Sequence, residues 1–99
     1  MELVLNNLLE KKEILDGVQF IFKFDNMFGA SVVKHKGSYG NNAGLWELAV
    51  IKFDNHGSWQ IDTSTKITDD WYNVIGFLEP KEVESILKKI NNLIPKKGE

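Results

Sequence analysis

Residues 45–53, LWELAVIKF, are the stretch on which the fold prediction depends. Their side chains alternate between two faces, and this period of two is typical of a β-strand. One face carries Leu45, Glu47, Ala49, Ile51 and Phe53, and the other carries Trp46, Leu48, Val50 and Lys52. Both faces are largely apolar between Leu48 and Ile51. The pattern therefore predicts a central strand that is covered on both sides, or covered by a helix on one side and partly by aromatic side chains on the other.

Two further strands and a helix are predicted before this stretch. Residues 18–24 have an alternating pattern with a face rich in phenylalanine, and residues 30–35 form a second strand candidate after a turn signal at 25–29. Residues 2–13 are predicted to form a short amphipathic helix, because their leucines fall mainly on one helical face. The Asp-Gly pair at 16–17 is expected to end that helix, because glycine tolerates the backbone of a helix end or tight turn.

The C-terminal half is predicted to contain a fourth strand and a second helix. The strand covers residues 58–62 and follows a turn at 54–57, whereas residues 71–78 are read as either a strand or one helical turn. The helix opens at 79–82, with Pro80 in the first turn, where its missing N–H costs nothing. Its apolar stripe consists of Val83, Ile86, Leu87, Ile90, Leu93 and Ile94. Pro95 is expected to end the helix and leave 95–99 as a flexible tail.

These elements predict one α+β domain of 99 residues. It is a four-stranded antiparallel meander with an N-terminal and a C-terminal helix packed on one face. The phenylalanine face of residues 18–24 and the stripe of the C-terminal helix are the expected partners, and their contact should dominate stability. The tetrapeptide Lys-Phe-Asp-Asn ends two predicted strands, at 23–26 and 52–55. We interpret this echo as convergent turn chemistry rather than a repeat, because Asp and Asn both favour turns.

The composition excludes several functional classes. The chain has no cysteine, which excludes a disulfide framework, a thiol nucleophile and a cysteine zinc site. Its net charge of −2 is near balance, unlike a DNA-mimicking inhibitor or a duplex-binding domain. No apolar run approaches the ~20 residues that span a bilayer, and residues 1–15 do not have the pattern of a secretory signal. The expected location is the cytoplasm.

The connection between the second and third strands is the main candidate binding site. Residues 34–46, KHKGSYGNNAGLW, contain three glycines and two adjacent asparagines. The candidate partner-binding side chains are Lys34, His35, Lys36, Ser38, Tyr39, Asn41 and Asn42, with Trp46 at the base. Tyr and Asn suit adaptable interfaces. The alternative is a long hairpin connection whose glycines and asparagines serve the backbone alone, and the sequence leaves both open.

The polar residues elsewhere do not form a recognisable catalytic or metal site. His35 and His56 lie near predicted turns, and a metal would need a third ligand such as Asp25 or Asp54, at a spacing that matches no known ligand set. A general-base role for either histidine lacks an identifiable nucleophile. Neighbouring carboxylates at 69–70 point to opposite faces of a strand, so a helix-capping role is the simpler interpretation. No metal, no cofactor and no enzymatic activity are expected.

The aromatic residues give a weaker signal for nucleic acid. Bases could stack on Trp46, Trp59, Trp71, Tyr39 and Tyr72. Every basic residue is lysine, however, and the absence of arginine counts against recognition through bidentate contacts. Core or interface roles are therefore favoured for these side chains.

About half of the chain resembles a group of short proteins encoded by phages and prophages of low-GC Gram-positive bacteria. The residues that carry the resemblance are Gly29–Val33, Gly37–Gly40, Gly44–Val50, Ile67–Asp70 and Val74–Leu78. The resemblance implies a cytoplasmic phage accessory protein that acts in the host, and it supplies no catalytic residues.

The sequence therefore leads to two functional hypotheses. The first is a small non-enzymatic phage accessory protein that binds and modulates a host protein or defence system. The alternative is an accessory protein that binds nucleic acid or nucleotides. No membrane partner is expected, and homodimerisation through an exposed strand edge remains open.

Overall fold

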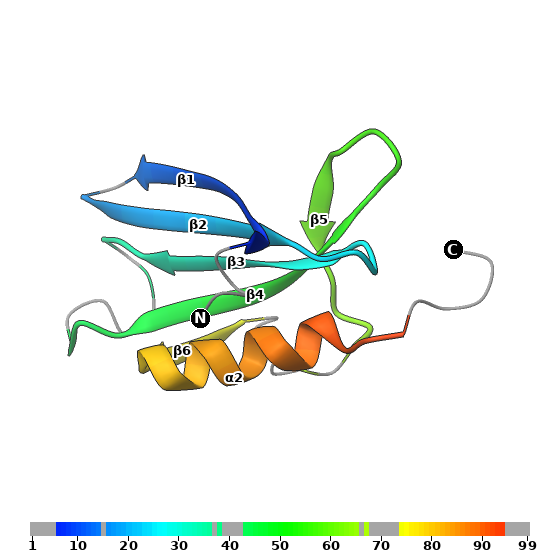
Figure 1. Ribbon diagram of the computed structural model, residues 1–99. Coiled ribbons are helices and arrows are strands. Elements are labelled where there is room, and N and C mark those ends of the chain that lie inside the picture. Colours follow the sequence, from blue (N-terminus) through cyan, green and yellow to red (C-terminus); the bar gives the residue numbers. More distant parts are fainter. Residues whose placement is uncertain are drawn as a thin grey trace.

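An antiparallel sheet with one helix across one of its faces forms the fold (Figure 1). The computed structural model describes residues 6–14, 16–36, 38, 43–65, 67 and 74–94. The elements in chain order are β1 (Leu8–Ile14), β2 (Gly17–Lys23), β3 (Phe28–Lys34), β4 (Trp46–Phe53), β5 (Trp59–Ile61), β6 (Ile75–Leu78) and α2 (Pro80–Asn91). This is a sheet-rich α+β domain.

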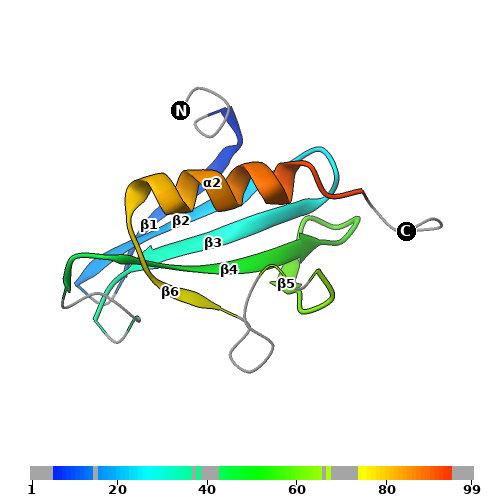
Figure 2. The same cartoon turned by 90° about the horizontal axis from the view of Figure 1, so that it is seen from below.

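Strand β4 has neighbours along both of its edges. The strand order is β1-β2-β3-β4-β5, and β6 also pairs with β4. On the edge away from β3, β5 pairs with the last residues of β4 (51–53), and β6 pairs near its beginning (46–48). Two strands therefore share one edge of β4, and Figure 2 shows them beside different parts of it. The sequence pattern correctly predicted β4 as a central strand.

The helix-covered face contains the larger core. From the sheet it includes Phe22, Phe24, Phe28, Ala30, Val32, Leu48, Val50 and Leu78, and from α2 it includes Val83, Leu87 and Ile90. The predicted contact between the phenylalanine face and the helical stripe is therefore confirmed. Burial of each large apolar side chain contributes about 1.5–3 kcal/mol. Ile94 was predicted on the same stripe, but it follows the helix and is 88% exposed.

The opposite face of the sheet also has an apolar cluster, and no helix of the described residues covers it. Ile21, Ile51 and Phe53 are buried there, and Met27 packs against them. The ammonium group of Lys23 lies 5.2 Å from the centroid of the Phe53 ring. The helix on one side of the central strand agrees with the prediction, and on the other side the cluster contains one aromatic side chain, Phe53 of β4 itself.

The predicted N-terminal helix is wrong over residues 8–13, which belong to β1. β1 pairs antiparallel with β2, and Ile14 lies opposite Gly17. Asp16, with a φ of 60°, therefore belongs to a hairpin turn rather than a helix stop, and Gly17 begins β2. A helix of about 12 residues is marginal on its own. Pairing with the edge of β2 satisfies the backbone of this segment instead.

The predicted number of strands is also wrong, because the sheet has six strands rather than four. The two additions are β1 and β6. Residues 75–78, which the sequence left as strand or helical turn, form β6. Among the described residues α2 is the helix that covers the sheet, so two helices on one face are not observed.

Both ends of α2 are stabilised by specific hydrogen bonds. At the N-terminus, the backbone N–H of Glu79 donates to Oε1 of Glu82 at 3.0 Å, and Pro80 occupies the first turn as predicted. At the C-terminus, the side-chain amide of Asn26 donates to the carbonyl oxygens of Ile90 (2.8 Å) and Leu93 (2.9 Å). Asn26 belongs to the turn between β2 and β3, so one side chain joins the sheet to the end of the helix.

Gly17 allows the β1–β2 turn to approach the end of β3 closely. A Cβ atom at this position would clash with the carbonyl oxygen of Lys34 and with Cα of His35. We therefore expect Gly17→Ala to displace the backbone at 34–35 and lower the free energy of unfolding by about 1–3 kcal/mol. Urea denaturation measures the loss. Lys36→Ala, at an exposed neighbour, is the control, and an equal change in both variants would contradict the prediction.

Candidate functional site

The structure brings together two of the side chains predicted for the binding loop. The Nζ atom of Lys34 lies 4.5 Å from the centroid of the Trp46 ring. Trp46 is half-buried, and its ring lies 5.7 Å from the ring of Phe20, centroid to centroid. Trp46 thus anchors the base of the loop to the sheet, on the face that carries α2.

Two other predicted residues bond with each other in a tight turn. The hydroxyl of Ser38 donates to the carbonyl oxygen of His35 at 2.8 Å and accepts from the backbone N–H of His35 at 3.0 Å. Nδ1 of His35 lies 2.9 Å from the carbonyl oxygen of Lys36, whose side chain is exposed. These local bonds favour the backbone interpretation for the start of the loop. The predicted contacts Tyr39, Asn41 and Asn42 lie outside the described residues.

Lysine side chains lie against the aromatic rings at this end of the sheet. Nζ of Lys11 is 5.7 Å from the centroid of Phe20, as Lys34 lies over Trp46. Cation–π contacts of this kind contribute about 0.5–1 kcal/mol at exposed sites. The sequence reasoning missed Lys11 because it placed this residue on a helix. Rings that contact the protein's own lysines give no support to base stacking, so nucleic-acid binding stays a prediction.

The remaining polar candidates shape turns. In the β4–β5 turn, Oδ1 of Asp54 accepts from the backbone N–H of His56 (2.8 Å) and of Ser58 (3.0 Å). The carboxylate of Asp62 accepts from the hydroxyl of Ser64 at 2.9 Å. In the part of the chain that the structure describes, no three His, Cys, Asp or Glu side chains are placed to hold a metal ion.

A bulge in β6 presents an aromatic side chain that the sequence reasoning did not single out. Ile75 lies opposite Leu48 and Leu78 lies opposite Trp46, so Gly76 and Phe77 together face Glu47. Phe77 has a φ of 57°, in the left-handed region, and its side chain is 62% exposed. The left-handed region is strained for a bulky side chain. Glycine within a strand pattern often marks a bulge, so Gly76 was the signal in the sequence.

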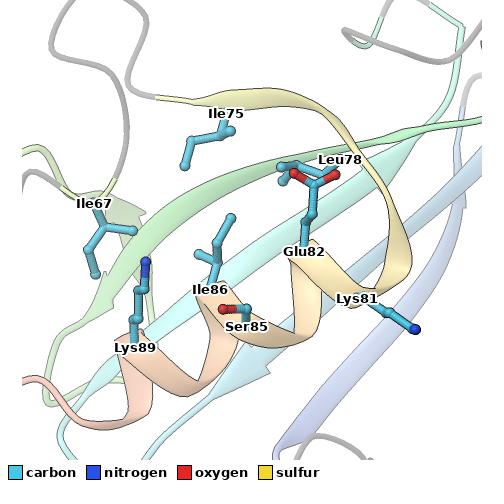
Figure 3. A pocket seen from close by; sticks show the side chains of 8 residues that line it. All are labelled: Ile67, Ile75, Leu78, Lys81, Glu82, Ser85, Ile86 and Lys89. Atoms are coloured by element: carbon cyan, nitrogen blue, oxygen red, sulfur yellow. The ribbon is translucent and has the colours of Figure 1, made fainter.

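A groove of about 640 Å³ lies between β6 and α2 (Figure 3). Its residues are Ile67, Ile75, Leu78, Lys81, Glu82, Ser85, Ile86 and Lys89, and we call this surface the β6 shelf. The isoleucines and Leu78 form its apolar part, and the polar residues come from α2. Ile67, Ile75 and Ile86 are each half-buried, so part of this apolar surface reaches solvent. Two residues of the β6 shelf, Ile75 and Leu78, lie on the same short strand as Phe77.

Membrane insertion through a helix finds no support in the described residues, because none of their helices has the length and apolarity of a membrane span. Compared with protein-family models, with curated proteins and with solved structures, the chain matches none of them.

Proposed function

We propose that the protein is a non-enzymatic binding protein that attaches to another protein through β6, with Phe77 as the main anchor. The observation that carries the proposal is the exposed aromatic ring of Phe77 on a left-handed backbone. Strain of this kind is found at functional sites, where surrounding structure holds a side chain in position. Large aromatic side chains are also the residues that dominate the energy of protein interfaces.

The bulge places Phe77 in this conformation, but burial of its ring does not compensate for the cost. A left-handed backbone costs roughly 1–2 kcal/mol for a residue with a side chain, and the exposed ring of Phe77 returns little of that through burial. Asp16 and Met27 also have positive φ values, but both lie in turns, and Met27 packs against the smaller core. Phe77 instead lies within a strand. Burial of the Phe77 ring in a partner would compensate for the energetic cost of this conformation.

The identity of the partner depends on the resemblance to phage and prophage proteins. In that setting the partner is a host protein or a component of a defence system, and binding changes its activity. The shape of the surface supports binding to a protein, whereas the phage origin and the host target rest on the resemblance.

Site-specific photo-crosslinking tests the proposal. A photo-reactive benzoylphenylalanine replaces Phe77 in the full chain, expressed in a low-GC Gram-positive bacterium, and crosslinked products are identified by mass spectrometry. We expect a discrete protein adduct from this position. The same reagent in place of Trp59, which is 36% exposed on β5, is the control. No adduct at 77, or the same set of adducts at both positions, would rule out Phe77 as the anchor.

A further inference from the structure

We infer that the β6 shelf binds an amphipathic helix of the partner, with an apolar stripe and acidic residues on its flank. This inference rests on the proposed function and names the class of segment that the surface accepts. Three features carry it: the position of the shelf beside α2, its apolar floor, and its two lysines.

The first feature is the space beside α2. The helix packs mainly on β3 and also contacts β4 and β6, and Figure 2 shows β6 lying alongside it rather than under it. Packed helices lie about 8–10 Å apart, and strands lie about 4.8 Å apart. A second helix beside α2 would therefore lie about two strands further out than β3. That position is the strip of sheet where β6 lies next to β4.

The second feature is an apolar floor contributed by both neighbouring elements. Ile75 and Leu78 extend from β6 towards α2, and Ile86 faces them from the helix (Figure 3). Ile67 closes one end of the groove. Ile75 and Ile86 are only half-buried in the free protein. A stripe of leucine-like side chains would cover this floor, and each one buried contributes about 1.5–3 kcal/mol.

The third feature is the charge along the helical side of the shelf. Lys81 and Lys89 are exposed and lie eight residues apart on α2, with Ser85 midway between them. Glu82 also lines the groove, but its carboxylate accepts the backbone N–H of Glu79 at the start of the helix. The rise along α2 places the two lysine positions about 12 Å apart. Acidic side chains seven or eight residues apart on a parallel or antiparallel helix match that spacing.

The strand edge beside the shelf is a poorer docking site. Among the described residues β6 pairs with β4 alone, but its bulge at 76–77 interrupts the regular backbone that another strand would need. Bulges at sheet edges are a known protection against strand addition. An extended peptide would also need acidic residues about four positions apart to reach both lysines.

Selection from a displayed peptide library distinguishes these occupants. The full-length protein is immobilised, and a random library of 16-residue peptides is selected for binding. Enriched peptides are then synthesised, and their affinities are measured by fluorescence anisotropy. We expect apolar residues at spacings of three and four, helical circular dichroism on binding, and acidic residues seven or eight apart.

The matched variants test the shelf itself. The double charge reversal Lys81→Glu with Lys89→Glu should weaken a selected peptide about tenfold or more, which equals about 1.4 kcal/mol. Lys88→Glu, on the side of α2 that pairs with Glu84, should change affinity less than about twofold, within the range of surface effects. All three lysines are exposed, so we expect each variant to fold. Thermal unfolding checks this expectation.

Four results would overturn the inference. They are peptides with an extended rather than helical period, peptides with basic flanks, no enriched peptide at all, and equal weakening by Lys88→Glu. If the proposed function fails but the inference holds, the results differ from these. The selected helical peptides then lose affinity in the Lys81 and Lys89 variants, but the photo-reactive group at position 77 gives no crosslink. If position 77 gives a crosslink but the library yields no helical peptides, the proposed function is kept and the inference that the β6 shelf binds a helix is rejected.

Discussion

Asn26→Asp is expected to destabilise the folded protein by about 2–4 kcal/mol, the largest loss among the substitutions considered. The amide of Asn26 donates to the carbonyl oxygens of Ile90 and Leu93 at the end of α2, and its Oδ1 accepts the backbone N–H of Phe28 at 2.9 Å. The substitution removes the donor, so the carbonyl oxygen of Leu93 loses its bond from Asn26 and that of Ile90 keeps the bond from the backbone N–H of Leu93. It also places a negative charge at the negative end of the helix. Urea denaturation measures the loss as a lower midpoint.

Two comparisons isolate the cause of that loss. Asn26→Ala removes the bonds without adding charge, so it should cost less than Asn26→Asp. Protonation removes the added charge, so the deficit of Asn26→Asp should shrink as the pH falls towards about 4. Asn55→Asp places the same change in the matching position of the second Lys-Phe-Asp-Asn segment, where the side chain is exposed. Equal losses at both positions would show that Asn26 does not connect the sheet to the helix.

Phe77→Gly is expected to act on stability and binding in opposite directions. Glycine adopts a φ of 57° without strain, which relieves roughly 1–2 kcal/mol, and its greater freedom in the unfolded chain offsets about 0.5–1 kcal/mol. The free energy of unfolding should therefore rise by up to about 1.5 kcal/mol. Loss of a central aromatic anchor costs about 2 kcal/mol or more in binding, which weakens the partner identified by crosslinking about 30-fold. Denaturation and titration with that partner measure the two effects.

Trp59→Ala is the matched control for Phe77→Gly. Trp59 is also an exposed aromatic residue on the same edge of β4, but β5 pairs with the other end of that strand. We expect it to leave partner affinity within about twofold, as is usual for a surface change away from the interface. A fall in stability for Phe77→Gly would contradict the strain argument. Unchanged affinity would contradict the role of Phe77 as an anchor.

The sequence predicted the elements whose hydrophobic period is unambiguous. Alternation in residues 18–24 and 45–53 correctly identified β2 and β4, and Pro80 with the apolar stripe correctly identified α2. These segments are buried on at least one face, so the pattern of their side chains follows the structure directly. β5 was also predicted, from the turn signal before it, although its residues are exposed.

The sequence did not predict β1, because the exposed side chains of this strand show no clear hydrophobic period. Its residues from Leu9 to Glu13 are exposed, with an irregularity in the pairing between Leu8 and Glu10. Lysine and glutamate favour helices in isolation, and the edge of β2 overrides that preference through backbone pairing. The Asp-Gly pair at 16–17 was the signal for a hairpin at this point, because this pair also favours a tight hairpin turn.

The repeated Lys-Phe-Asp-Asn segment illustrates where sequence similarity fails to predict the role of a residue. In the first copy Asn26 shapes the turn by accepting from Phe28, and in the second Asp54 does so by accepting from His56. The two turns are thus built one position out of step, which supports convergent turn chemistry over a repeat. Only tertiary structure shows that Asn26 also reaches α2.

The binding loop expected from the sequence stays a prediction, and the surface around Phe77 was not predicted. Lys34 and Trp46 do meet, but Ser38 and His35 bond to each other. Phe77 was assigned no functional role from the sequence, because neither the exposure of a side chain nor a left-handed backbone produces a periodic pattern of hydrophobic residues. The β6 shelf joins Ile67 with residues of β6 and α2, so its composition depends on the packing of α2.

The shared edge of β4 has a consequence for the order in which the domain opens. Because β5 and β6 occupy different parts of that edge, β6 can detach while β5 stays in place. Amide hydrogen exchange should then show β6 exchanging through a low-energy local fluctuation, with the interior of β4 protected up to global unfolding. A ligand that holds β6 in place would slow its exchange selectively, which gives a kinetic signature of occupancy before any partner is identified.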